Sequence, residues 1–218
     1  MTKKSSAETA RSKGLVLGSG SPRRSEILTA AGIAFEIIVS NVDELTREGE
    51  APPDLATRLA QEKCLAVAAS IQDGPARPVL GADTIVVAPP GLGLDDVLGK
   101  PRDEAHAVEL LSRLVGQTHQ VMTGVAVAWT DGRGPWSTVV TSEVEMRPAT
   151  REELVEYVAV GESLDKAGGY ALQGEGARFI VGVKGSRTNV IGLPQEESLA
   201  LLGEAGVEDA LLRDGLKP

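Results

Sequence analysis

The stretch PVLGADTIVVA, residues 78 to 88, is apolar almost throughout, with Asp83 in its middle. Strict alternation of apolar and polar residues would indicate a strand with one solvent face, whereas a near-continuous apolar run predicts a strand covered on both faces. Such a strand needs helices on both sides of its sheet, and helical patterns do separate the apolar runs of this chain. The sequence therefore predicts an α/β protein with a mixed sheet.

The other segments continue this alternation. Helices are expected from residue 21 to about 32, from about residue 53, and at 102–116, 150–160 and 194–206. Strands are expected at 14–17, 35–42, 179–185 and 189–194. The turn DGRGP separates two strand-like runs at 119–129 and 137–146, which predicts an antiparallel hairpin inserted into the alternating pattern.

The charge of the chain argues against a general nucleic-acid surface. Its 218 residues include 22 lysines and arginines and 31 aspartates and glutamates, a formal net charge of −9. Because phosphate backbones attract basic surfaces, we expect no nucleic-acid partner, and any basic cluster needs a local explanation. No stretch is long and apolar enough to span a bilayer, so we expect no membrane partner either.

A chain of this length can bury a sizeable core, as one substantial domain or two small lobes. We expect a disordered leader at 1–13, one folded domain at 14–207 and a tail at 208–218. The leader lacks the apolar centre of a signal peptide. Cys64 is the only cysteine, which excludes an internal disulfide and fits a reducing, cytoplasmic location.

The stretch LVLGSGSPRRSEIL, residues 15 to 28, places two arginines after a turn of small residues. The turn lets backbone amides approach a ligand, and the following helix directs its positive end to the same place. Arg23 and Arg24 add charged donors, so the stretch suits phosphate. A flexible turn with two solvated arginines is the alternative, and at least one arginine is a candidate for a structural role because adjacent helical positions diverge.

Three charged residues suggest chemistry. Lys63 lies on the apolar side of its helix, where a lysine must extend to solvent or meet an anion. Asp83 interrupts an apolar strand, and a buried carboxylate needs a partner or a metal, so it is the first candidate for a general base or metal ligand. Glu44, or alternatively Asp43, follows another predicted strand. Two carboxylates near phosphate oxygens suit Mg²⁺ or Mn²⁺, although an exposed loop acid is the simpler interpretation of Glu44.

Weaker candidates for the same site are Lys100, Asp165, Lys166, Ser186, Arg187 and Asn189. The run that begins at Asp165 is rich in glycine, which marks tight turns or close ligand approach but also occurs in plain loops. His106 and His119 are isolated from each other and form neither a triad nor a zinc site, so we expect ordinary surface or hydrogen-bonding roles.

Several motifs recur together: SGSPRRSEIL, NVDE, QEKCLA, GADTIVV, GKPRDEAHAVELLSRLVGQTHQVMTGVAV, SLDKAGGYALQGEGARFI and GSRTNVIGLP. In this order, over roughly residues 14 to 200, they resemble the Maf family of nucleoside triphosphate pyrophosphatases, a far more specific signal than any single motif. The resemblance implies a curved mixed sheet flanked by helices, two lobes with a central cleft similar to inosine triphosphatase-like enzymes, and a homodimer.

The resemblance also implies hydrolysis of a nucleoside triphosphate to the monophosphate and pyrophosphate with a divalent metal, Mg²⁺ or Mn²⁺. Asp83 matches the family's proton acceptor and Glu44 its acidic position near the metal. The residues expected to bind phosphate are Ser19, Ser21, Arg24, Lys63, Lys100 and Lys166, and Asp165 is a further cleft position. The loop between Val87 and Gly99 is longer and richer in glycine and proline than the family pattern.

Three positions resemble the family branch that acts on dTTP and UTP: Arg23, Thr84 and Gln173. The branch acting on 7-methyl-GTP tends to carry an aromatic residue, Gln and Glu there. Arginine only donates hydrogen bonds, so it satisfies a uracil or thymine carbonyl but not the amino group of cytosine, while the Gln173 amide donates and accepts. We therefore predict dTTP, UTP or modified pyrimidine nucleotides as substrates.

Three other functions remain open. The chain could act on 7-methyl-GTP or another nucleoside triphosphate with the same chemistry. A nucleotidyltransferase that loads a sugar phosphate onto a nucleotide would also use a Gly-Ser loop followed by arginine, although no feature after residue 120 suggests an acceptor-sugar pocket. A nucleotide-binding regulator of septum formation is the alternative that needs no catalysis.

Overall fold

The computed structural model describes residues 14–89 and 97–208, which form two compact units. The first unit contains the described parts of Met1–Asp83, Gly124–Val139 and Gln195–Pro218, and the second those of Thr84–Thr123 and Val140–Pro194. The predicted leader, most of the loop before Gly99 and the tail from residue 209 lie outside the described residues. Within these ranges, no helix has the length and apolar character needed to cross a membrane.

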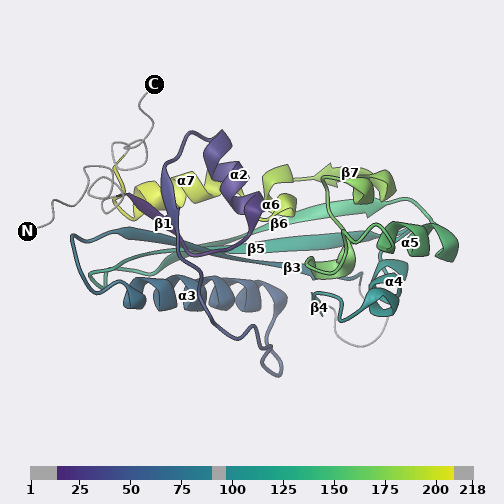
Figure 1. The fold of residues 1–218 in the computed structure, drawn as a ribbon, viewed down its shortest axis with the longest axis horizontal. Coiled ribbons are helices and arrows are strands. Elements are labelled where there is room, and N and C mark those ends of the chain that lie inside the picture. The colour runs from purple at the N-terminus through teal and green to yellow at the C-terminus, as the bar shows by residue number, and fades with distance from the viewer. Residues whose placement is uncertain (1–13, 90–96, 209–218) are drawn as a thin grey trace, which may run out of the picture. The chain divides into compact units, whose positions relative to one another are not determined.

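A seven-stranded mixed sheet confirms the predicted fold class (Figure 1). Its strands are β1 (Leu15–Leu17), β2 (Phe35–Ile37), β3 (Pro78–Val87), β4 (Val97–Leu98), β5 (Thr118–Trp129), β6 (Trp136–Met146) and β7 (Ile180–Lys184). The order is β2-β1-β3-β5-β6-β7, and β4 pairs with β3 outside this path. β1 is parallel to β2 and β3, whereas β4 and β7 are antiparallel to β3 and β6.

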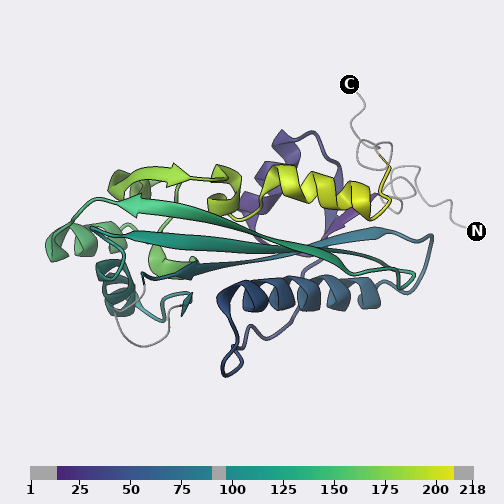
Figure 2. The same cartoon turned by 180° about the vertical axis from the view of Figure 1, so that it is seen from behind.

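Helices of the first unit cover its strands on both faces. They are α2 (Pro22–Ala30), α3 (Pro52–Ser70) and α7 (Gln195–Glu204). α3 lies on one face, and α2 and α7 lie on the other (Figures 1 and 2). Buried apolar residues of β1, α3, β3 and β5 form one core cluster, which includes Val16, Cys64, Val79 and Ala126. The near-continuous apolar run at residues 78 to 88 is thus explained, within this unit, by coverage on two sides.

Two glycines let the backbone of α3 rest directly on the sheet. A Cβ atom on Gly124 would lie 2.1 Å from the carbonyl oxygen of Ala56, and one on Gly81 would lie 2.7 Å from that of Ala60. Real side chains do not approach a backbone this closely, so only glycine permits the observed packing.

The second unit packs short helices around its own core. These are α4 (Glu104–Ser112), α5 (Arg151–Val158), α6 (Arg187–Ile191) and the 3₁₀ turns η1 (Ala167–Gly169) and η2 (Glu175–Phe179). Its core includes Leu111, Leu114, Tyr157 and Phe179, all fully buried. Thr150 starts α5 with a capping box, in which its side chain and that of Glu153 bond reciprocally to the backbone.

Two predicted strands differ from the structure. The strand expected at 189–194 is wrong, because the Ser186 hydroxyl accepts a hydrogen bond from the Asn189 amide at 3.2 Å and starts α6 there. Gly192, with φ of 130°, then ends that helix. The strand expected at 35–42 shortens to Phe35–Ile37, since its neighbour β1 has only three residues with which to pair.

Candidate active site

The first unit brings three predicted site residues into contact. Lys63 Nζ donates to Asp83 Oδ1 at 2.5 Å and to Glu44 Oε1 at 2.6 Å. Lys63 is 8% exposed and Asp83 is 6% exposed, whereas Glu44 lies in an exposed loop. Lys63 therefore meets two anions instead of extending to solvent. The two buried charges compensate each other, which is the condition under which a carboxylate is tolerated in a core.

The register of β3 explains why Asp83 faces Lys63. Gly81 lies on the face of β3 that packs against α3, because a Cβ atom added to it would lie 2.7 Å from the Cβ of Cys64. Side chains two residues apart on a strand point to the same face, so Asp83 also points toward α3. Lys63 immediately precedes Cys64 on that helix, and the ion pair follows from this placement.

Arg24 holds the loop that follows β1. Its Nη1 atom donates to Ser19 Oγ at 2.9 Å and to the carbonyl oxygen of Ala82 at 2.8 Å. Ser19 Oγ also accepts from the Ser21 amide at 3.3 Å. Burial lowers the pKa of Arg24, and the nearby Asp83 carboxylate opposes that shift. Arg24 therefore has the structural role expected for one of the two arginines, while Arg23 remains half-buried.

Ser21 occupies the N-cap position of α2, but its side chain makes no capping hydrogen bond. The backbone amide of Ser21 donates to Ser19 Oγ at 3.3 Å. Pro22 begins the helix, because its fixed φ suits the first helical position and it lacks an amide hydrogen.

The carboxylates of the first unit suit a hydrated divalent cation. Among residues 14–89 and 97–208, no three His, Cys, Asp or Glu side chains cluster in a way that could hold a metal ion. Asp83 and Glu44 are nevertheless joined through Lys63 Nζ. Mg²⁺ usually binds through one or two carboxylates together with water and substrate phosphates, so this donor set fits such an ion better than a metal held by protein alone.

The other predicted site residues belong to the second unit. Lys166 Nζ donates to the carbonyl oxygen of Glu162 and to Asp165 Oδ1, both at 2.6 Å, so Asp165 and Lys166 pair with each other. Lys100 and Gln173 are exposed. Thr84 is half-buried, and its hydroxyl lies 3.0 Å from the hydroxyl of Thr123.

Sequence reasoning missed Thr123 and gave Asn189 only as a weak candidate. Both side chains are completely buried, and Thr123 Oγ1 donates to the carbonyl oxygen of Asn189 at 3.1 Å. The available signal was a polar residue inside the apolar run VMTGVAVAW, comparable to Asp83 in its own strand.

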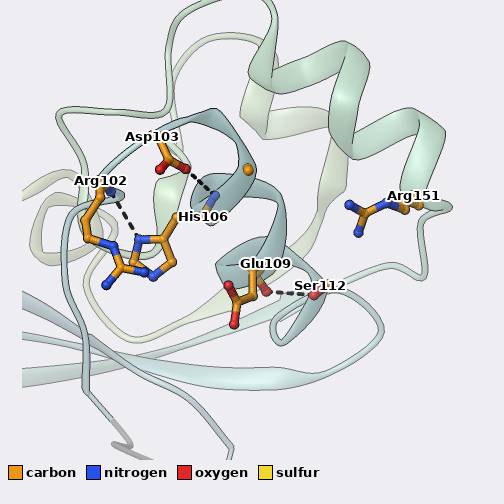
Figure 3. Close-up of a pocket in the computed structure, with 7 residues that line it drawn as sticks. Arg102, Asp103, His106, Glu109, Ser112 and Arg151 are labelled. Carbon is orange, nitrogen blue, oxygen red and sulfur yellow. Dashed lines mark hydrogen bonds between the residues drawn. The ribbon is translucent and has the colours of Figure 1, made fainter.

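A surface cavity of the second unit lies beside the start of α4 (Figure 3). It is lined by Arg102, Asp103, Ala105, His106, Glu109, Ser112 and Arg151. Asp103 accepts from the His106 amide at 2.7 Å, and His106 Nδ1 accepts from the Arg102 amide at 3.1 Å. These bonds cap the helix, and no residue predicted to act on a substrate lines this cavity.

A family model and the relatives of similar sequence agree on one family. A model described as Maf-like protein matches residues 14–205. A dTTP/UTP pyrophosphatase of Escherichia coli O157:H7 is 46% identical over 189 residues, covering 86% of this chain and 91% of the relative. A dTTP/UTP pyrophosphatase of Geobacter sulfurreducens is 44% identical over 180 residues, covering 83% and 90%. A nucleoside-triphosphatase / dITP/XTP pyrophosphatase from Mycobacterium abscessus is similar in structure with a TM-score of 0.39 and 14% identity, covering 91% and 97%.

Proposed function

The chain belongs to the Maf family, and on that premise we propose that it hydrolyses dTTP and UTP to the monophosphate and pyrophosphate. The observation that carries the proposal is the buried contact between Asp83 and Lys63, which keeps an acidic group at a fixed position inside an apolar strand. The relatives at 44% to 46% identity that are named dTTP/UTP pyrophosphatases support the choice of substrate.

Asp83 is the general base of this proposal. Its carboxylate accepts a proton from water, the water oxygen forms a bond to the α-phosphorus, and the bond from that phosphorus to the bridging oxygen of the β-phosphate breaks. Pyrophosphate leaves with the bridging oxygen and its electron pair. Lys63 positions the carboxylate through the 2.5 Å contact, and a fixed base lowers the entropic part of the barrier.

Positive side chains offset the charge of the triphosphate. Arg24 fixes Ser19 beside the backbone of Ala82 while adding a buried cation to that loop. The full set proposed to bind phosphate is Ser19, Ser21, Arg24, Lys63, Lys100 and Lys166, with Asp165 holding Lys166. Charge-assisted bonds to phosphate oxygens are stronger than neutral ones. Arg24 and the three lysines of this set therefore both bind the substrate and stabilise the charge that develops on pyrophosphate.

The proposal includes a divalent cation. Asp83 and Glu44 are the residues that would hold Mg²⁺ or Mn²⁺, which when bound supplies polarisation of the α-phosphoryl group. We also propose that the protein works as a homodimer in the cytoplasm; the family resemblance supports the dimer, and the single cysteine fits a reducing compartment.

Base selection is assigned to Arg23, Thr84 and Gln173. A guanidinium donates to a base carbonyl, and a glutamine amide offers one donor side and one acceptor side. Modified pyrimidine nucleotides that keep the same hydrogen-bonding edge are therefore further substrates in this proposal.

The test is pyrophosphate release from a panel of nucleoside triphosphates with Mg²⁺ or Mn²⁺, with both products identified. We expect fast release from dTTP and UTP and slow release from CTP and purine nucleotides. Preference for 7-methyl-GTP would keep the chemistry and overturn the base assignment. Turnover only when a sugar phosphate is added would indicate a nucleotidyltransferase, and binding without turnover would favour a regulatory role.

A further inference from the structure

The loop at residues 173–175 of the second unit is tied to the segment after α5 by a carboxylate. The backbone amide of Glu175 donates to Glu162 Oε2 at 2.9 Å. A Cβ atom added to Gly174 would lie 2.9 Å from the same oxygen and closer still to Oε1, so the carboxylate packs directly against the backbone of Gly174. Glu162 is half-buried, whereas the three residues of the loop are exposed. The exposed loop therefore rests on the side chain of Glu162.

Gly174 has the backbone conformation that this contact requires. Its φ of 103° and ψ of −158° lie in a region that essentially only glycine adopts. Such a conformation persists where the surrounding structure holds it. The carboxylate of Glu162 does so, because it occupies the space that a Cβ atom would take and accepts a hydrogen bond from the next amide. Gln173 directly precedes this glycine, so the placement of its backbone depends on Glu162.

Neighbouring contacts shape the loop but do not replace Glu162. The chain enters the loop from residues 170–172, which are buried. The Ala177 amide donates to the carbonyl oxygen of Gly174 at 3.2 Å, a bond that shapes the chain after the glycine without attaching it to the segment after α5. Because glycine rotates freely at φ and ψ, the two sides of the loop would move relative to each other if the Glu175 amide lost its acceptor. Glu162 Oε2 fixes the far side of this glycine.

The main chain of Glu162 contacts a second proposed site residue. Lys166 Nζ, which is proposed to bind phosphate, donates to the carbonyl oxygen of Glu162 at 2.6 Å. The side chain of Glu162 thus supports the loop that carries Gln173, while its carbonyl holds Lys166. A substitution at residue 162 removes the carboxylate and leaves the carbonyl, so its effect on Gln173 can be measured apart from phosphate binding.

We propose that Glu162 is a positioning residue for base recognition: it fixes the 173–175 loop so that the Gln173 amide meets the edge of the pyrimidine. The inference rests on the proposed function, in which Gln173 contacts the base. A side chain whose backbone is already placed loses less conformational entropy when the substrate binds. The base lies away from the phosphorus that reacts, so its contacts are equally strong in the ground state and the transition state. Losing them raises KM and leaves kcat nearly unchanged.

The test measures KM and kcat for UTP in the wild type and in Glu162→Ala, with the folding of each protein checked by its melting curve. We expect KM to rise by about tenfold, the scale of one hydrogen bond gained or lost, and kcat to change by less than about twofold. Glu162→Gln keeps an oxygen that can accept from the Glu175 amide and should recover most of the loss.

Glu175→Ala is the matched control. Like Glu162→Ala, it removes one negative charge beside this loop, but it keeps the backbone amide that bonds to Glu162. Negative side chains repel a triphosphate, so the change of charge alone would lower KM in both variants. Glu162→Ala should therefore raise KM, and Glu175→Ala should not.

A double variant separates positioning from general support of the fold. If Glu162 acts through Gln173, adding Glu162→Ala to Gln173→Ala should raise KM by less than about twofold beyond Gln173→Ala alone. A further tenfold rise of KM, as large as in the wild-type background, would mean that Glu162 acts independently of Gln173 and would overturn the inference.

An unchanged KM in Glu162→Ala, or a fall in kcat alone, would also overturn the inference while hydrolysis of UTP by the wild type stands. A wild-type KM in Gln173→Ala would remove the base contact that the inference needs. A wild type that hydrolyses no nucleoside triphosphate would overturn both the inference and the proposed function. If Glu162→Ala does not fold, Gly174→Ala displaces the loop with the carboxylate left in place and carries the same expectation.

Discussion

Replacing Gly124 by alanine should strongly destabilise the protein, because the new Cβ would lie 2.1 Å from the carbonyl oxygen of Ala56 in α3. Cβ atoms essentially never approach within 3.0 Å of other heavy atoms, so helix and strand must separate by about 1 Å. A backbone oxygen cannot turn aside as a flexible side chain can, and the separation loosens the core beneath α3.

Overpacking costs about 1–3 kcal/mol and occasionally more, and a required backbone shift puts Gly124→Ala at the upper end, about 3 kcal/mol. For a chain of this size, that loss lowers Tm by roughly 6–12 °C. Gly81→Ala has a milder conflict, 2.7 Å to the oxygen of Ala60, and should lose about 1–2 kcal/mol. The Gly81→Ala substitution also displaces α3 beside Lys63. The kcat of the variant should therefore fall even when only the folded protein is counted.

Denaturant unfolding and thermal melts measure these losses, and Gly203→Ala is the matched control. Gly203 lies in α7, and a Cβ added to it would meet no heavy atom within 4 Å, so alanine there should stabilise the protein by about 0.5–1 kcal/mol through helix propensity. A Gly124→Ala protein as stable as wild type would refute the reasoning, since α3 could not then rest on β5 as described.

Three further predictions concern buried groups. Lys63→Met removes the ammonium group that pairs with the buried Asp83 carboxylate, so the free energy of unfolding in urea should fall by about 3–5 kcal/mol. Lys63→Arg keeps a positive charge and should lose less. Equal losses in the two variants would argue against an ionic role for Lys63. Burial lowers the pKa of His119 from 6.5 to about 4, so between these pH values the unfolded state binds a proton that the folded state does not. The free energy of unfolding should therefore fall by about 3 kcal/mol as the pH drops from 6.5 to 4. His119→Gln should remove this part of the pH dependence. Burial raises the pKa of Cys64 to about 12, so a thiol reagent at pH 8 should label it only after unfolding, and rapid labelling of the native protein would contradict its burial.

The pattern of apolar residues predicted much of the fold and part of the site. Asp83 and Lys63 were both recognisable because each puts a charge where periodicity demands an apolar residue. Their direct contact was not predictable, since it depends on which face of β3 meets α3. The close approach of Gly81 to Cys64 shows that this face of β3 packs against α3. A glycine in a strand does not by itself reveal which helix it contacts, so the sequence alone could not predict this packing.

The long-range polar contacts could not be predicted from the periodicity of apolar residues. Thr84, Thr123 and Asn189 lie far apart in the sequence, and each alone resembles an ordinary polar residue. The segment after Ser186 looked like a strand because its apolar composition suits either state, and a single serine side chain bonding to the Asn189 amide decided for a helix. Short apolar runs are ambiguous for this reason.

The most direct test of the account is the steady-state hydrolysis of UTP by Asp83→Asn beside the wild type, with folding of both proteins checked by their melting curves. The substitution keeps the size of the side chain but removes the group that accepts the proton of water. The account predicts a folded protein whose kcat falls by at least about 10²-fold, the scale of general base catalysis. A folded Asp83→Asn protein with kcat close to that of the wild type would contradict the role of Asp83 as the general base.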